Sequence, residues 1–210
     1  MIDKNQIERN AHQKISETDS YTKERYMSFL THFSTDQLSI LDFGCNTGRG
    51  GEVLKEKNPN LTLYGADIIK ERLQKIPINI YEKIFDLSEI NLNDTNILLD
   101  AIVSGEVVEH IPFEILVEYL IVFKRLLKSN GKLILTTPNP NSFLVRLGRD
   151  GVIKDPSHIN LMNYKFLLEV LLKLGYKNCK LVGSGKATRF VGRNFPLMGV
   201  YGSYMIIASV

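Results

Sequence analysis

The chain has 210 residues, 44% of them hydrophobic, which suffices for one substantial core but is short for two independently folding enzymes. Its 26 basic and 23 acidic residues are scattered and leave a net charge of +3, so nucleic acid is not indicated as a partner. The two cysteines, Cys45 and Cys179, are too few and too far apart for a disulfide framework or a zinc knuckle. Together with the lack of an apolar leader or a membrane-length apolar window, they lead us to expect a soluble, cytoplasmic protein.

Two parts are expected along the chain. Residues 1–38 mix charged and aromatic side chains, which predicts one or two helices that form an N-terminal cap over a ligand cleft. Residues 39–210 alternate short apolar runs with amphipathic segments, which is typical of a single α/β domain built on a parallel sheet. We predict strands near 39–43, 61–66, 79–84, 100–104, 131–137, 177–183 and 203–209. We predict helices near 48–58, 69–75, 112–128 and 163–174, with Asn130-Gly131 ending the third of them.

A glycine-rich turn follows the first predicted strand. In ILDFGCNTGRGG (40–51), the strand ends at Asp42-Phe43 and glycines follow at 44, 48, 50 and 51. Glycine permits backbone to approach a ligand closely, and the N-terminus of the next helix offers N–H groups to a polar ligand. The dinucleotide fingerprint G-x-G-x-x-G is not matched, so a plain strand-to-helix connection is the alternative for this turn.

Acidic residues end the next two predicted strands. Asp67 closes LTLYGADI (61–68), where a carboxylate can accept hydrogen bonds from both hydroxyls of a ribose. Asp86 lies in IFDL (84–87), where it could meet an adenine amino group while Leu87 supplies a backbone N–H and an apolar contact. These residues fall at the strand ends where open α/β sheets bind ligands.

The ordered set of the 40–51 turn, Asp67, Asp86 and AIVSGEVVEHI (101–111) resembles class I S-adenosylmethionine-dependent methyltransferases over about residues 39–137. The resemblance implies a Rossmann-like α/β fold. Its sheet has seven mostly parallel strands in the order 3-2-1-4-5-7-6, the last one antiparallel, with helices on both faces. It also implies S-adenosylmethionine as cofactor, with Asp42 orienting the glycine turn. The cofactor-binding residues it implies are Asp42, Gly44, Cys45, Asn46, Gly48, Asp67, Ile68, Asp86, Leu87 and Gly105.

The candidates for chemistry follow the fourth and fifth predicted strands. Glu106 and His158 are the candidate catalytic residues, since methyl transfer requires alignment of a nucleophile and removal of one proton, for which imidazole is well suited. A loop histidine bonded to backbone is the alternative for His158. In the N-terminal region, Tyr21 and Arg25 could contact cofactor or substrate if the helices close over the cleft. For both residues, the preferred roles are packing on the helix face and solvation.

The same segments resemble a subset of the family, the ubiquinone-pathway O-methyltransferases and the small-RNA 2′-O-methyltransferases. There E-x-x-E-H and a later histidine hold a divalent metal against the substrate hydroxyl. The resemblance implies Glu106, Glu109, His110 and His158 as ligands for Mg²⁺, Mn²⁺ or Zn²⁺. The alternative is a metal-independent enzyme in which Glu106 faces the cofactor edge and His110 makes a helix-start hydrogen bond.

The expected function is transfer of a methyl group from S-adenosylmethionine to a hydroxyl of a small molecule. A sugar or sugar-containing metabolite is preferred, because the Pro-Asn at 138–139 and the later His-Ile-Asn segment resemble polysaccharide-pathway methyltransferases. Two alternatives stay open. One is a metal-dependent O-methyltransferase acting on a catechol or a ribose diol, and the other is a non-catalytic module that binds the cofactor.

Overall fold

The computed structural model describes residues 8, 10–11, 19–33, 38–147 and 155–210. Much of the predicted cap over 1–38 lies outside the described residues, so the division of the chain at residue 38 stays a prediction. Among the helices that the structure does describe, none combines the length and apolarity needed to cross a membrane.

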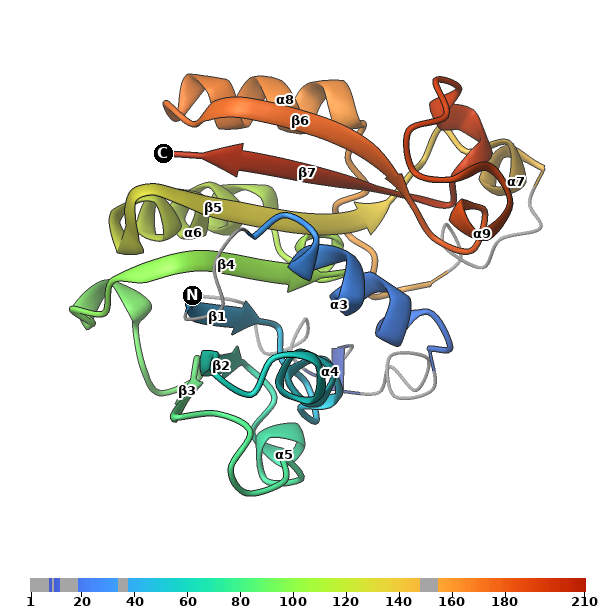
Figure 1. Ribbon diagram of the computed structural model, residues 1–210. Helices are drawn as coiled ribbons and strands as arrows, with labels where there is room; N and C mark the ends of the chain where they lie inside the picture. The colour runs from blue at the N-terminus through green and yellow to red at the C-terminus, as the bar shows by residue number, and fades with distance from the viewer. Residues whose placement is uncertain (1–7, 9, 12–18, 34–37, 148–154) are drawn as a thin grey trace.

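A seven-stranded sheet in the order β3-β2-β1-β4-β5-β7-β6 forms the centre of the molecule (Figure 1), which confirms the predicted fold class. Strand β7 runs antiparallel to β5 and β6, and the other pairs are parallel. The strands are β1 (Ser39–Phe43), β2 (Thr62–Asp67), β3 (Lys83–Asp86), β4 (Leu99–Gly105), β5 (Leu127–Pro138), β6 (Lys177–Ser184) and β7 (Ser203–Ser209).

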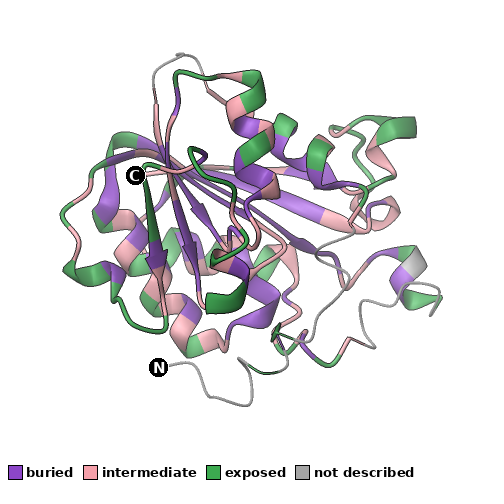
Figure 2. Ribbon diagram, turned by 90° about the horizontal axis from the view of Figure 1, so that it is seen from below, coloured by how far each residue is buried: buried purple, intermediate pink, exposed green. Residues whose placement is uncertain are grey.

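Helices cover both faces of this sheet. Alternate strand residues point to opposite faces, so Leu41 packs in the core beneath α6 and α8 while Ile40 packs with α3 and α4. Figure 2 shows the strands buried along most of their length. The helices are α3 (Thr22–Leu30), α4 (Arg49–Lys57), α5 (Lys70–Leu73), α6 (Phe113–Leu126), α7 (Phe143–Arg146), α8 (Tyr164–Lys173) and α9 (Thr188–Val191), with short 3₁₀ turns η1 (Leu92–Asp94), η2 (Val108–His110) and η4 (Met198–Val200).

Three predicted boundaries were wrong. The third strand begins at Lys83 rather than near residue 79, because the chain turns through Asn79 with a φ of 74°. The helix predicted over 112–128 ends at Leu126, and Asn130-Gly131 does not terminate it. Leu127 is already extended and buried and pairs with Leu99, so the next strand starts earlier than predicted.

Candidate active site

A cavity of about 370 Å³ opens at the carboxyl ends of the strands. Its walls come from the segments that follow β1, β2 and β4, and α3 contributes Thr22, Arg25 and Tyr26. Parallel strands point their carboxyl ends to one edge, so segments far apart in sequence meet there. Seven of the predicted cofactor-binding residues line the cavity. They are Gly44, Cys45, Asn46, Asp67, Ile68, Leu87 and Gly105.

The turn after β1 has a conformation that requires glycine at its start. Gly44 has a φ of +80°, and a Cβ there would lie 2.3 Å from the Val107 side chain. The turn is held against β2, because the N–H groups of Gly44 and Cys45 both donate to the Ala66 carbonyl. Gly48, with a φ of 85°, is the N-cap of α4 and does not line the cavity. The turn is therefore a fixed cradle beside the cavity.

Asp42 lies beneath this turn, fully buried and outside the cavity lining. Tyr26 donates a 2.7 Å hydrogen bond to one of its carboxylate oxygens and Tyr81 a 2.6 Å bond to the other. Burial raises the pKa of Asp42 to about 6. The carboxylate thus joins α3, β1 and the segment before β3.

Asp67 faces the cavity from the end of β2. Its carboxylate accepts 2.9 Å hydrogen bonds from the N–H groups of Asn46 and Ile69, and burial raises its pKa. Asp86 does not line the cavity, and one of its carboxylate oxygens accepts hydrogen bonds from the N–H and hydroxyl of Ser88. The Leu87 N–H, which was predicted to meet the adenine, donates a hydrogen bond to the Asp67 carbonyl. Leu87 offers the cavity an apolar side chain instead.

Arg25 lines the cavity from α3 and is only 8% exposed, so the preference for solvation at this residue was wrong. Its guanidinium lies 2.9 Å from Asp19, and its Nε lies 3.8 Å from Glu106 Oε1. The side chain also covers Gly105, where a Cβ would come 2.9 Å from Arg25 Cδ. Nothing in the local sequence distinguishes this arginine from the other basic residues. Only the docking of α3 across the strand ends brings it to the cavity.

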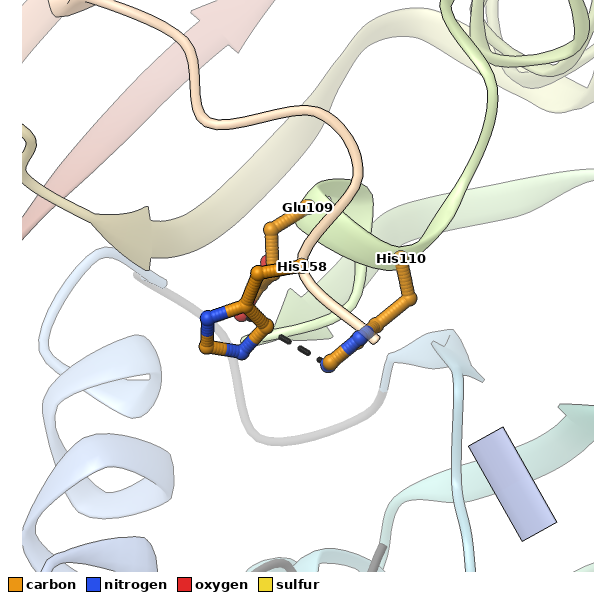
Figure 3. A group of neighbouring side chains, drawn as sticks. All are labelled: Glu109, His110 and His158. Carbon is orange, nitrogen blue, oxygen red and sulfur yellow. Dashed lines mark ion pairs between the residues drawn. The ribbon is translucent and has the colours of Figure 1, made fainter. Parts of the chain in front are cut away.

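Three of the four predicted metal ligands come together in the lining of the cavity (Figure 3). Ligand atoms of Glu109, His110 and His158 all lie within 4.8 Å of one another. Thr137 donates to Glu109 Oε2, whereas the buried Glu109 Oε1 has no hydrogen-bond donor among the described residues. A carboxylate and two imidazoles are a donor set that suits a divalent transition metal.

The electrostatics of this cluster follow from its burial. Desolvation, aided by the neighbouring His158, lowers the pKa of His110 to about 4, so this imidazole is neutral at pH 7. Burial and the charge of Glu106 hold the pKa of Glu109 well above its usual range. His110 Nδ1 lies 3.1 Å from the Ser157 carbonyl, rather than making the helix-start bond considered above. This contact ties η2 to the segment that carries His158.

Glu106 is not among the clustered ligand atoms, although its charge acts on Glu109. Its backbone takes a φ of 59°, and its Oε2 accepts a 3.0 Å hydrogen bond from Ser203. Its other oxygen faces Arg25. The two candidate catalytic residues, Glu106 and His158, both line the cavity, and His158 Nε2 lies 3.9 Å from the Asp155 carboxylate.

Comparison with known proteins assigns this arrangement to a family. Residues 17–181 match a family described as a methyltransferase domain. No curated protein matches the sequence.

Solved structures share the fold at low sequence identity. An S-adenosylmethionine-dependent methyltransferase from Archaeoglobus fulgidus superposes with a TM-score of 0.69 at 20% identity, covering 90% of this chain and 92% of that one. The small RNA methyltransferase HEN1 gives 0.69 at 19% identity, covering 90% of this chain and 25% of that one. Phosphoethanolamine N-methyltransferase 2 of Haemonchus contortus, in complex with S-adenosyl-L-methionine, gives 0.63 at 13% identity, covering 89% and 52%.

Proposed function

Since this chain belongs to the class I S-adenosylmethionine-dependent methyltransferases, we propose that it methylates a hydroxyl of a small molecule, with a sugar or sugar-containing metabolite preferred. Its cofactor is S-adenosylmethionine. The proposal that the acceptor is a hydroxyl rests on the position of His158. This imidazole lines the cavity, with an acidic partner, Asp155, beside it.

The cofactor would extend along the glycine turn. Asp67 would accept hydrogen bonds from the ribose, because its two oxygens are already oriented by backbone N–H groups. Leu87 would pack against the adenine. The opposite charges of Arg25 and Glu106 would receive the carboxylate and the ammonium of the methionine moiety beside Gly105.

Bound S-adenosylmethionine supplies a methyl group on a sulfonium, which the acceptor oxygen takes by in-line displacement. The protein then has to align the acceptor, exclude water and take one proton. His158 would accept the hydroxyl proton, and the Asp155 carboxylate would stabilise the resulting imidazolium. His110 stays neutral and holds the segment around His158 in place.

The test is calorimetric titration of metal-stripped protein with S-adenosylhomocysteine, followed by an acceptor screen that measures methylated product. Asp67→Ala should weaken binding about tenfold or more. His158→Gln should bind normally and lose about a hundredfold or more in turnover. Unchanged turnover would refute the role of His158, and binding without any product would favour the non-catalytic module.

A metal-dependent enzyme acting on a catechol or ribose diol is the second candidate. It is favoured by the Glu109, His110 and His158 cluster and by the buried Glu109 oxygen that lacks a donor. A bound Mg²⁺, Mn²⁺ or Zn²⁺ would lower the pKa of the acceptor hydroxyl. Titration with each metal alone should then give stoichiometric binding that His110→Gln abolishes.

A further inference from the structure

Exposed apolar side chains are concentrated on two segments, 143–147 and 190–197, which meet where α7 contacts η4 directly after the second segment. We call this the α7–α9 surface, and it consists of Phe143, Leu147, Phe190, Val191, Phe195 and Leu197. Figure 1 shows α7 and α9 at the same end of the molecule. Phe190 is 88% exposed and Leu147 is 67% exposed. Single exposed apolar residues are ordinary, but a gathering of aromatic and aliphatic side chains marks an interaction site.

The two segments of this surface are joined and held in shape by the fold. Phe143 packs on η4, where a Cβ on Gly199 would come 2.9 Å from its ring. The buried Asn139 donates to the carbonyls of Met198 and Tyr201. The Tyr201 hydroxyl donates to the Gly192 carbonyl and accepts from the N–H of Phe195. These hydrogen bonds fix the backbone that carries the exposed apolar side chains.

The charged residues of the same segments are all basic. Arg146 lies in 139–147, and Lys186, Arg189 and Arg193 lie in 185–200, with no acidic residue in either range. Arg189 is paired with Glu24 of α3 and Lys186 lies within electrostatic reach of Asp19, whereas Arg146 is exposed in a segment with no acidic residue. The surface thus combines apolar side chains that can insert with cations that favour an anionic partner.

We propose that the α7–α9 surface docks on an anionic phospholipid bilayer, with its phenylalanine and leucine side chains among the acyl chains and its basic residues at the headgroups. A second copy of this chain fits the surface less well. A two-fold contact would bring the basic residues of both copies together, and like charges repel.

Docking would also orient the cavity. Tyr21 and Thr188 share a 2.8 Å hydrogen bond, and Arg193 donates to the Glu24 carbonyl, so α9 is attached to the helix that contributes Arg25 to the cavity wall. The bilayer would therefore lie beside the cavity. This proposal does not depend on the identity of the methyl acceptor.

The experiment is vesicle co-sedimentation of the full chain. We use vesicles of phosphatidylcholine alone and vesicles with about one-quarter phosphatidylglycerol. Binding is expected only with the anionic lipid and should fall about tenfold or more in about 0.5 M salt. The double variant Phe190→Ser/Leu197→Ser should bind about tenfold more weakly than the wild type. The matched control Phe166→Ser changes an exposed phenylalanine on α8 and should bind like the wild type.

Affinity for S-adenosylhomocysteine shows whether each variant is folded and is independent of the vesicle measurement. The proposal is overturned if the wild type does not bind anionic vesicles, if it binds both kinds equally, or if the double variant binds like the wild type. It is equally overturned if ultracentrifugation reveals a dimer that the double substitution dissociates, because the surface would then be an interface between copies.

Discussion

The hydroxyl of Tyr26 on α3 lies 2.7 Å from the carboxylate of Asp42 on β1, and this hydrogen bond fastens the N-terminal helix to the strand that precedes the glycine turn. The Tyr26 ring also occupies the space above Gly50, where a Cβ would come 2.1 Å from it. Tyr81 holds the other carboxylate oxygen from the segment before β3. The cofactor turn, the helix that covers it and the edge of the sheet therefore share one buried anchor.

Tyr26→Phe should lower the free energy of unfolding by about 1–3 kcal/mol, because it removes one donor from a buried carboxylate. Tyr81→Phe should lower the free energy of unfolding by a similar amount. The loss in the double variant should differ from the sum of the two single losses, because both hydroxyls donate to the same carboxylate. Urea unfolding measures all three. The control is Tyr64→Phe, which changes a partly buried tyrosine of β2. An effect on stability as large as that of Tyr26→Phe would contradict the role of the hydrogen bonds to Asp42.

The stability contributed by Asp42 should fall as the pH rises. Its pKa goes from an ordinary 3.8 to about 6 on folding, so the folded state binds the additional proton between these values. The free energy of unfolding of the wild type, relative to Asp42→Asn, should be greatest below about pH 4. It should decrease by up to about 3 kcal/mol by the time the pH exceeds about 6. Urea unfolding of both proteins across this range checks the sign, and a difference that grows with pH would contradict it.

Gly44→Ala should weaken binding of S-adenosylhomocysteine about tenfold or more, because it adds both a strained φ and a clash with Val107. Val107→Ala in the same chain removes the clash but not the backbone strain, so the double variant should recover only part of the affinity. Gly192→Ala is the matched control, since its φ is also positive at +70° but a Cβ there meets nothing within 4 Å. Wild-type affinity in Gly44→Ala would show that the glycine turn does not contact the bound S-adenosylhomocysteine.

Arg25→Gln should reduce affinity for S-adenosylhomocysteine about tenfold, because it removes the cation that lies 3.8 Å from Glu106 in the cavity wall and is proposed to bind the methionine carboxylate. Arg25→Lys keeps the positive charge but lacks the planar guanidinium, so its affinity should lie between those of Arg25→Gln and the wild type. Arg189→Gln breaks the exposed pair with Glu24 and should leave the affinity unchanged. Equal affinities for Arg25→Gln and the wild type would place the methionine moiety elsewhere.

Features with a local cause could be predicted from the sequence. Short apolar runs identified most strands, and the glycines of the 40–51 turn indicated where the backbone takes a positive φ, because both features follow from the residues of the segment itself. The order of the strands came from the family resemblance and is confirmed by the structure. The start of β3 could not be predicted, because Ile78 and Ile80 continue an apolar pattern through a turn.

Tertiary structure alone decided which side chains share the site. The two tyrosines on Asp42 come from positions 26 and 81, and Glu109 meets His158 only because the later segment folds back over η2. It also turned Glu106 toward Ser203 and Arg25, away from the cluster to which its sequence neighbours belong. Such contacts depend on how helices and loops pack across the sheet, and that packing is set by the whole core rather than by any local pattern.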